Sequence, residues 1–363
     1  MERYAICCET PFQLLNAFNY TLNHDHKNIE IDLYIRKDFW LDIELINRVK
    51  NSSVFDRVFI FEYRKNDLLS DNKIRFVKIE RTFFPGWYIN KRLLNGKAYR
   101  NYSCIFVAFV QPFEYGLIHV NRDSELVYFD DGLASYTNNF PSEGFGRSRK
   151  ILKALGQDVN IYRPEVLYIN NKEFCSEAIT NNIKEFFPLK SAGPDFWQKI
   201  DYVFEYSNSG LYVKNKLVFL SMPNDLNRIE FSERVTRIIS ILNKRNCLIR
   251  PHPRDNRSFG DGISIDNHND LWELVCLRQI SDDNCLISIF STAQFTPKML
   301  YNKEPYLVFL YKLFSDFFEE SDRMSGMIDV IRSHYSNPSK IIVVESFEEL
   351  VDILDSMGLD NEH

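Results

Sequence analysis

The fold class is indicated by residues 3–22, RYAICCETPFQLLNAFNYTL. The short apolar run at 3–8 is typical of a buried β-strand, and the longer amphipathic stretch at 11–22 is typical of a helix. Thr10 can cap this helix, and Pro11 favours its first position. The stretch therefore predicts a strand that passes directly into a helix.

The same alternation of apolar runs and amphipathic stretches continues along the chain. In the first half, strands are predicted at 3–8, 29–35, 57–62, 104–110 and 125–129, with helices at 11–22, 37–49 and 112–120. In the second half, strands are predicted at 216–220, 247–250, 286–290, 306–310 and 340–344, with helices at 231–244, 271–278 and 347–357. Ser346 and Glu349 form a predicted capping box before the last helix. The pattern is that of βα units, so an α/β protein with parallel sheets is predicted.

The chain of 363 residues is too long for one ordinary domain and suits two. Glycine and proline interrupt the periodicity from about 141 to 210, and we predict the junction near 195–215. The predicted domains are an N-terminal Rossmann-like domain at 1–200 and a C-terminal Rossmann-like domain at 210–363. Two such domains facing each other across a cleft form the arrangement called GT-B.

Composition excludes several classes of protein. Hydrophobic residues make up 45% of the chain, which is enough for two cores, and the net charge of -6 argues against a general nucleic-acid binder. Seven cysteines without a CxxC pair are typical of buried free thiols in a reducing compartment. The sequence shows neither a signal peptide nor an apolar run long enough to span a bilayer. We expect a cytoplasmic protein, with any contact to the inner face of the membrane being peripheral.

Polar motifs follow four of the predicted strands. Open parallel sheets bind ligands beyond the carboxyl ends of their strands, so these positions are candidate sites. The motifs are ETPFQ at 9–13, DDG at 130–132, RPHPR at 250–254 and STAQ at 291–294.

Asp130 and Asp131 form the motif best suited to acid–base chemistry. They directly follow a predicted strand, and Gly132 lets the chain turn. Burial and the neighbouring negative charge would raise a carboxylate pKa toward the range useful for deprotonating a sugar hydroxyl. The alternative is a solvated Asp-Gly turn.

His252 and the pair Ser291–Thr292 are candidate anion-binding groups. Prolines on both sides of His252 restrict its backbone, and Arg250 and Arg254 add positive charge, which makes a cradle for phosphate. Ser291 and Thr292 fall where a strand should pass into a helix, so their hydroxyls and the helix-end amides could bind an anion. A structural turn and simple helix capping are the respective alternatives.

Taken in order, the four motifs resemble those of the bacterial sialyltransferases of glycosyltransferase family 52, the lipooligosaccharide and capsule type. The resemblance implies a metal-independent, inverting enzyme without a cofactor. It also implies that the acceptor binds the N-terminal domain and the nucleotide of a CMP-sialic acid donor binds the C-terminal domain. It assigns the role of general base to Asp131, with Asp130 as the second candidate. It assigns the departing CMP phosphate to His252, Ser291 and Thr292. Arg250 and Pro253, which flank His252, complete the predicted phosphate-binding set. Thr10, Pro11 and Gln13 are predicted to lie on the acceptor side or in the cleft.

Other functions stay open at this point. Kdo transferases also use CMP donors, and teichoic-acid-type polymerases transfer glycerol or ribitol phosphate from a CDP donor. A non-catalytic nucleotide- or glycan-binding protein is a third alternative. The expected partners are a CMP-sugar donor and a glycan acceptor, not nucleic acid, and homodimer formation is left open.

Overall fold

The computed structural model describes residues 1–37, 43–62, 84–94, 101–132, 134–137, 164, 166–177, 179, 182–222, 229–255, 257–260, 262–317 and 321–357. The chain divides into two compact units, Met1–Phe204 and Glu205–His363. Each unit contains one parallel sheet with helices packed against it.

Within the described residues, the N-terminal unit has a seven-stranded sheet in the order β3-β2-β1-β4-β5-β6-β7, and each described pairing is parallel. The strands are β1 (Glu2–Cys8), β2 (Ile29–Arg36), β3 (Arg57–Phe61), β4 (Cys104–Val107), β5 (Glu125–Phe129), β6 (Val166–Ile169) and β7 (Asn182–Glu185). The chain runs outward from β1 to β3 and then returns to build β4 on the other side of β1. The order of the sheet therefore reverses between β1 and β4, which is where such sheets bind ligands.

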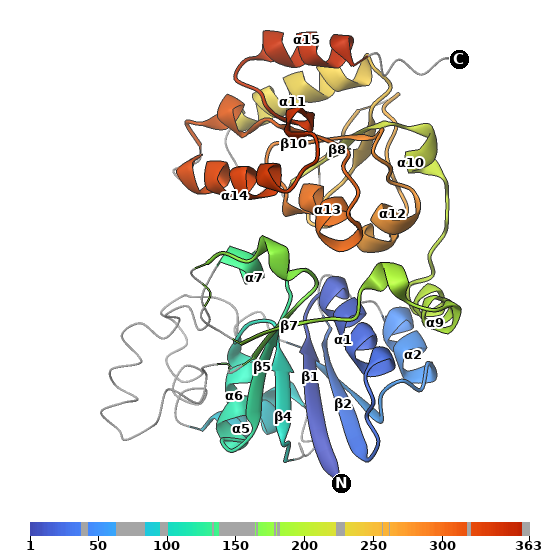
Figure 1. Cartoon of the computed structure of the whole chain (residues 1–363), viewed down its shortest axis with the longest axis vertical. Coiled ribbons are helices and arrows are strands. Elements are labelled where there is room, and N and C mark those ends of the chain that lie inside the picture. Colours follow the sequence, from blue (N-terminus) through green and yellow to red (C-terminus); the bar gives the residue numbers. More distant parts are fainter. Residues whose placement is uncertain are drawn as a thin grey trace. The chain divides into compact units, whose positions relative to one another are not determined.

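The helices of this unit cover both faces of the sheet. They are α1 (Pro11–Asn23), α2 (Ile43–Asn51), α5 (Pro85–Tyr88), η1 (Ile89–Leu93), α6 (Pro112–Val120), α7 (Ala134–Thr137), η3 (Lys172–Phe174), η4 (Leu189–Ser191) and α9 (Pro194–Phe204). α1 and α2 lie against one face, and α5 and α6 lie against the other (Figure 1). This division follows from right-handed βαβ crossovers that proceed in opposite directions from β1.

The described C-terminal residues form a five-stranded parallel sheet in the order β12-β11-β10-β8-β9. The strands are β8 (Leu217–Leu220), β9 (Leu248–Arg250), β10 (Cys285–Ser288), β11 (Tyr306–Phe309) and β12 (Ile341–Val343). The helices are α10 (Leu211–Lys214), α11 (Ile229–Asn243), α12 (Trp272–Arg278), η5 (Thr292–Phe295), α13 (Thr296–Tyr301), η6 (Tyr311–Phe314), α14 (Ser321–Ser333), η7 (Pro338–Lys340) and α15 (Phe347–Ser356). Here the order reverses between β8 and β10.

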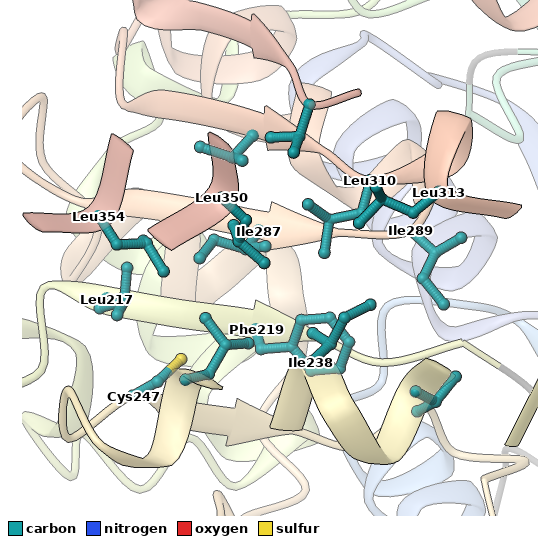
Figure 2. Close-up of a cluster of buried hydrophobic side chains, with 14 of the residues drawn as sticks. Leu217, Phe219, Ile238, Cys247, Ile287, Ile289, Leu310, Leu313, Leu350 and Leu354 are labelled. Carbon is teal, nitrogen blue, oxygen red and sulfur yellow. The ribbon is translucent and has the colours of Figure 1, made fainter. Parts of the chain in front are cut away.

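The C-terminal core packs two helices onto one face of this sheet. Figure 2 shows Phe219 and Ile287 of the strands beside Ile238 of α11 and Leu350 and Leu354 of α15. Ile238 and Leu350 are fully buried. α12 and α13 lie on the opposite face (Figure 1). Both faces of the sheet are covered, which explains why its strands are continuous apolar runs.

The predicted elements are present, with changes at several ends. The strand predicted at 104–110 ends at Val107, and the one predicted at 286–290 spans Cys285–Ser288. The described part of the helix predicted at 37–49 begins at Ile43, and residues 38–42 lie outside the described residues. Several elements were not predicted, among them β6, β7, α9, α10, α13 and α14.

Ser346 does cap the last helix, because its hydroxyl accepts a hydrogen bond from the N–H of Glu349. The second hydrogen bond of the predicted capping box differs. The carboxylate of Glu349 accepts from the N–H of Glu345, 2.7 Å away, one residue before the cap.

All seven cysteines are free thiols, and six are buried; Cys175 is partly exposed. Among the described residues, we find no helix with both the length and the apolar character that crossing a membrane requires.

We predict that Ile238→Ala destabilises the C-terminal unit by about 2–5 kcal/mol, because it leaves a cavity in a fully buried position. Ile229 lies on the same helix and is 79% exposed, so Ile229→Ala is a matched control with an expected effect below about 0.5 kcal/mol. Chemical denaturation followed by fluorescence measures both. Equal effects for the two variants would contradict the assigned packing of α11.

Candidate functional site

The first candidate site lies beyond the carboxyl ends of β1 and β5. β4 lies between these strands and pairs with both. Thr10 caps α1, because its hydroxyl accepts the N–H of Gln13 at 3.2 Å, and Pro11 occupies the first turn. These two residues therefore shape the start of the helix, as the sequence predicted; that they contact an acceptor stays a prediction.

Asp130 is an anchor inside the protein. Its side chain is almost completely buried, and its Oδ1 accepts the N–H of Gly132 at 2.8 Å. Its Oδ2 accepts hydrogen bonds from the hydroxyl of Tyr136 and from Nδ2 of Asn170, the latter at 2.8 Å. Burial raises the pKa of Asp130, and these hydrogen bonds act in the opposite direction. Both oxygens of Asp130 are thus engaged inside the protein, which is the arrangement of a structural anchor; a catalytic role for Asp130 stays a prediction.

Asp131 faces a different environment. Its N–H donates to Oγ of Ser135 at 2.9 Å, and its Oδ1 accepts from Nε2 of Gln13 at 2.6 Å. Burial raises the pKa of this carboxyl from 3.8 to about 7, the charges of Asp130 and Glu9 add to the increase, and the Gln13 hydrogen bond opposes it. A base with a pKa near the working pH is well matched to proton transfer. The acid pair is thus not a solvated turn, although Gly132 does adopt the positive φ (95°) expected of a turn.

The side chain of Gln13 is bound on both sides by protein groups. Its side chain is 1% exposed, and its Oε1 accepts the N–H of Glu9 at 2.6 Å while Nε2 donates to Asp131. Both ends of the amide are therefore engaged inside the protein. The polar atoms of Gln13 face Glu9 and Asp131, and that Gln13 lines the acceptor side of the cleft stays a prediction.

A buried pair of glutamates lies beside Gln13 and was missed from the sequence. Oε2 of Glu9 accepts from Nη1 of Arg36 at 2.6 Å. Glu114 on α6 is hydrogen-bonded to Glu9, and burial followed by the Glu9 charge raises the pKa of Glu114 well above its usual range. Burial and the Glu9 charge therefore favour the protonated form of Glu114. Glu9 follows a strand and Glu114 lies in the first turn of a helix, and no local sequence pattern predicts that these two residues are in contact.

Two side-chain amides connect the acid pair to the rest of the unit. Nδ2 of Asn16 on α1 donates to the carbonyl oxygen of Asp130 at 3.0 Å. Nδ2 of Asn170, just after β6, donates both to Oδ1 of Asn16 at 3.1 Å and to Asp130. These contacts hold the end of β5 against α1 and β6.

The second candidate site lies at the carboxyl ends of β8, β9 and β10. Ser221 directly follows β8, His252 follows β9 and Ser291 follows β10. The hydroxyl of Ser221 accepts the N–H of His252 at 2.7 Å. Ser221 was not recognised from the sequence, where its loop has no distinctive pattern, and it fixes the backbone of the His-Pro turn.

The ring of His252 has a defined tautomer in its neutral form. Nδ1 accepts the N–H of Arg254 at 3.1 Å, so the hydrogen of the neutral ring is placed on Nε2. Pro253 lacks an N–H and fixes the turn between these residues. His252 can therefore donate a hydrogen bond through Nε2, which suits a phosphate oxygen.

Arg250 is engaged in a network of its own. Its Nη1 donates to Oδ2 of Asp266 at 2.8 Å, its Nη2 donates to the carbonyl oxygen of Asp270 at 2.5 Å, and its guanidinium lies over the ring of Trp272 at 5.1 Å. Asp266 is buried and also accepts from the hydroxyl of Tyr212. The guanidinium of Arg250 therefore anchors the end of β9, and that it also binds phosphate stays a prediction.

Ser291 and Thr292 differ in their surroundings. The Ser291 hydroxyl accepts the N–H of Ala293 at 3.3 Å as a cap, which leaves its O–H available to donate. Thr292 is exposed. Two hydrogen bonds hold this loop. Nε2 of Gln294 donates to the carbonyl oxygen of Leu286 at 2.7 Å, and the indole N–H of Trp272 donates to the carbonyl oxygen of Ala293 at 2.8 Å.

Comparison with known proteins shows the fold. No protein-family model matches the sequence, and no curated protein matches it. Solved structures do match. The sialyltransferase of Photobacterium damselae, in the part that corresponds to its GT-B domain, is similar with a TM-score of 0.52 and 9% identity, over 94% of this chain and 100% of that one.

Two further structures have similar scores. Spinosyn forosaminyltransferase SpnP has a TM-score of 0.50 and 13% identity, over 99% of this chain and 92% of that one. An Arabidopsis thaliana protein complexed with UDP-L-rhamnose has a TM-score of 0.51 and 8% identity, over 97% and 89%. The predicted α/β class and GT-B fold are confirmed.

The pKa of Asp131 predicts a pH-dependent effect on stability. Because the folded protein holds this proton up to about pH 7 and the unfolded chain releases it near pH 4, folding loses stability as the pH rises between these values. The loss is at most ~1.4 kcal/mol per pH unit. Asp131→Asn removes it, so the melting temperature of the variant relative to wild type should increase from pH 5 to pH 8. Thermal melts at four pH values test this, and a constant difference would contradict the raised pKa.

Proposed function

We propose that the protein is an inverting, metal-independent glycosyltransferase of the sialyltransferase type that uses CMP-sialic acid and a hydroxyl of a surface glycan. The observation that carries the proposal is Asp131, whose partly buried carboxyl has a pKa near 7 at the end of β5. The resemblance of the four strand-end motifs to family 52 supports the choice of donor. The GT-B fold is compatible with that choice and also with UDP-sugar donors.

In the proposed reaction, Asp131 removes the proton from the acceptor hydroxyl as its oxygen attacks the anomeric carbon of the sugar. The glycosidic bond forms while the bond from that carbon to the phosphate oxygen breaks, and the electron pair leaves with CMP. The growing charge on the phosphate is stabilised by hydrogen bonds from Nε2 of His252 and from the hydroxyls of Ser291 and Thr292. The N-terminal unit thus supplies the base and the C-terminal unit binds the leaving group.

Metal independence is part of the proposal. Asp130 and Asp131 are the adjacent acids that could be taken for a metal clamp, but both oxygens of Asp130 already accept hydrogen bonds inside the protein. The pair therefore does not present two carboxylates to one ion. The leaving phosphate has protein donors in place of a metal.

We expect Asp131→Asn to lower kcat and kcat/KM together, by about 100-fold to 10,000-fold, while CMP affinity stays nearly unchanged. Asp130→Asn is the matched comparison. Its amide N–H would face the donors Tyr136 and Asn170, so its main effect should be lower thermal stability. Steady-state kinetics and thermal melts of both variants decide the assignment. A larger loss of kcat for Asp130→Asn, at equal folded fraction, would reverse it.

We expect CMP to bind the C-terminal site and His252→Ala to weaken this binding about tenfold or more, because a hydrogen bond to a charged group is lost. His252→Gln, which can place an amide N–H near the position of Nε2, should lose less. Calorimetry with CMP and with UMP measures both effects. Equal affinity for the two nucleotides, or full affinity in His252→Ala, would contradict the assignment.

A donor screen separates the sialyltransferase from the competing functions. The protein is incubated with CMP-sialic acid, CMP-Kdo, CDP-glycerol and UDP-sugars, and nucleotide release is measured in EDTA and again with Mg²⁺ or Mn²⁺. We expect release from CMP-sialic acid without metal. Release from another donor would change the substrate, and binding without release would favour a nucleotide-binding protein.

A further inference from the structure

Gln13 connects two residues that lie far apart in the sequence. It is in the first turn of α1, almost fully buried, with the N–H of Glu9 on one side and the carboxylate of Asp131 on the other. Both donor–acceptor distances are 2.6 Å. The first contact is to the residue after β1 and the second is to a residue just after β5, so the amide connects the ends of the two strands that flank β4.

The orientation of this amide is fixed by chemistry. A backbone N–H can only donate, so the amide oxygen must face Glu9 and the amide nitrogen must face Asp131. The nitrogen in turn can only donate. Oδ1 of Asp131 therefore remains an acceptor in both protonation states of the carboxyl.

The other oxygen of Asp131 has different surroundings. Within the described part of the chain, Oδ2 of Asp131 makes no hydrogen bond, whereas Oδ1 has Gln13 and the main-chain N–H has Ser135. We propose that Gln13 is the positioning residue of the base: its amide holds Oδ1 so that Oδ2 receives the proton of the acceptor hydroxyl. This inference rests on the proposed function and gives Gln13 a role that the resemblance did not assign.

The charges around Asp131 make this hydrogen bond important for its ionisation. The groups that face it are Asp130 on its own strand end, Cys8 at the end of β1, and Glu9 directly after β1. Behind Glu9 lie Arg36 of β2 and Glu114 of α6. The neighbouring carboxylates disfavour a further negative charge, and the Gln13 amide is a donor that favours it.

The test is the pH dependence of kcat/KM for the acceptor in Gln13→Met, which keeps the length of the side chain and removes both hydrogen bonds. Losing a hydrogen bond to a charged group should move the acidic limb of the profile upward by about one to two pH units. Activity should be reduced most at pH 6 and recover toward pH 9. CMP affinity should be unchanged, because the nucleotide binds the other unit.

A second variant and a matched control separate positioning from folding. Gln13→Glu is nearly isosteric and has no N–H to donate, so it should shift the limb in the same direction. Asn19 is a buried amide on the same helix whose Nδ2 donates to the carbonyl oxygen of Phe187 at 2.8 Å. Asn19→Leu should leave the limb in place. Partial unfolding lowers the amount of active enzyme and does not move the limb.

A double-mutant cycle gives an independent result. In the Asp131→Asn background, Gln13→Met should cause no further loss of rate, since the base on which it acts is absent. An unmoved limb in both Gln13 variants, or additive losses in the cycle, would overturn the proposal.

The carboxyl of Asp131 can also be titrated directly by NMR in the absence of substrate. The resonance of Asp131 should titrate at higher pH in Gln13→Met than in wild type. This measurement separates the two proposals: a wild-type protein that transfers no sugar contradicts the proposed function, while an unchanged titration of Asp131 contradicts the role of Gln13.

Discussion

The buried carboxylate of Asp130 is the interaction on which the N-terminal site depends. Burying a carboxylate costs free energy unless its oxygens accept hydrogen bonds. The oxygens of Asp130 accept hydrogen bonds from Tyr136 of α7, from Asn170 after β6 and from the N–H of Gly132 in the turn. Asn16 of α1 binds the carbonyl oxygen of the same residue. Four elements are therefore joined at one residue, and the next residue, Asp131, has little freedom to move.

In the C-terminal unit, a positively charged residue anchors a strand end in the same way. Arg250 is anchored by Asp266, by the carbonyl oxygen of Asp270 and by the ring of Trp272. Trp272 also holds the loop after β10 through Ala293. His252 lies two residues beyond this anchor. In both units, an ionisable residue at the strand end is held by several partners and fixes the backbone that carries the candidate functional side chain.

The sequence predicted the fold well because the signal was local. The βα alternation and the strand ends follow from apolar periodicity, which each segment carries by itself. β7 could not be found in this way: the run Asn182–Glu185 is polar and largely exposed, and its strand conformation depends on pairing with β6.

The direction in which polar side chains point was the part that the sequence could not predict. Gln13 lies in the motif that follows a predicted strand, and Arg250 is the last residue of another. At such positions the sequence does not distinguish a ligand-binding residue from a structural anchor. What decides between them is the partner, Asp131 for Gln13 and Asp266 for Arg250, and no local pattern connects these residues. The alternation of an extended backbone does predict that adjacent acids diverge, and Asp130 and Asp131 do so.

This divergence, together with the glutamates, determines which acid can change its charge near neutral pH. Four carboxyls are grouped in the described part of the N-terminal unit, and Arg36 is the cation that contacts them there. Burial and the Glu9 charge favour the protonated form of Glu114, Glu9 is paired with Arg36, and Asp130 is held by its hydrogen-bond donors. Since each of the other three is fixed by a partner, Asp131 is the carboxyl left to exchange a proton. Environments that push the pKa values of neighbouring acids apart are how one site separates an anchor from a base.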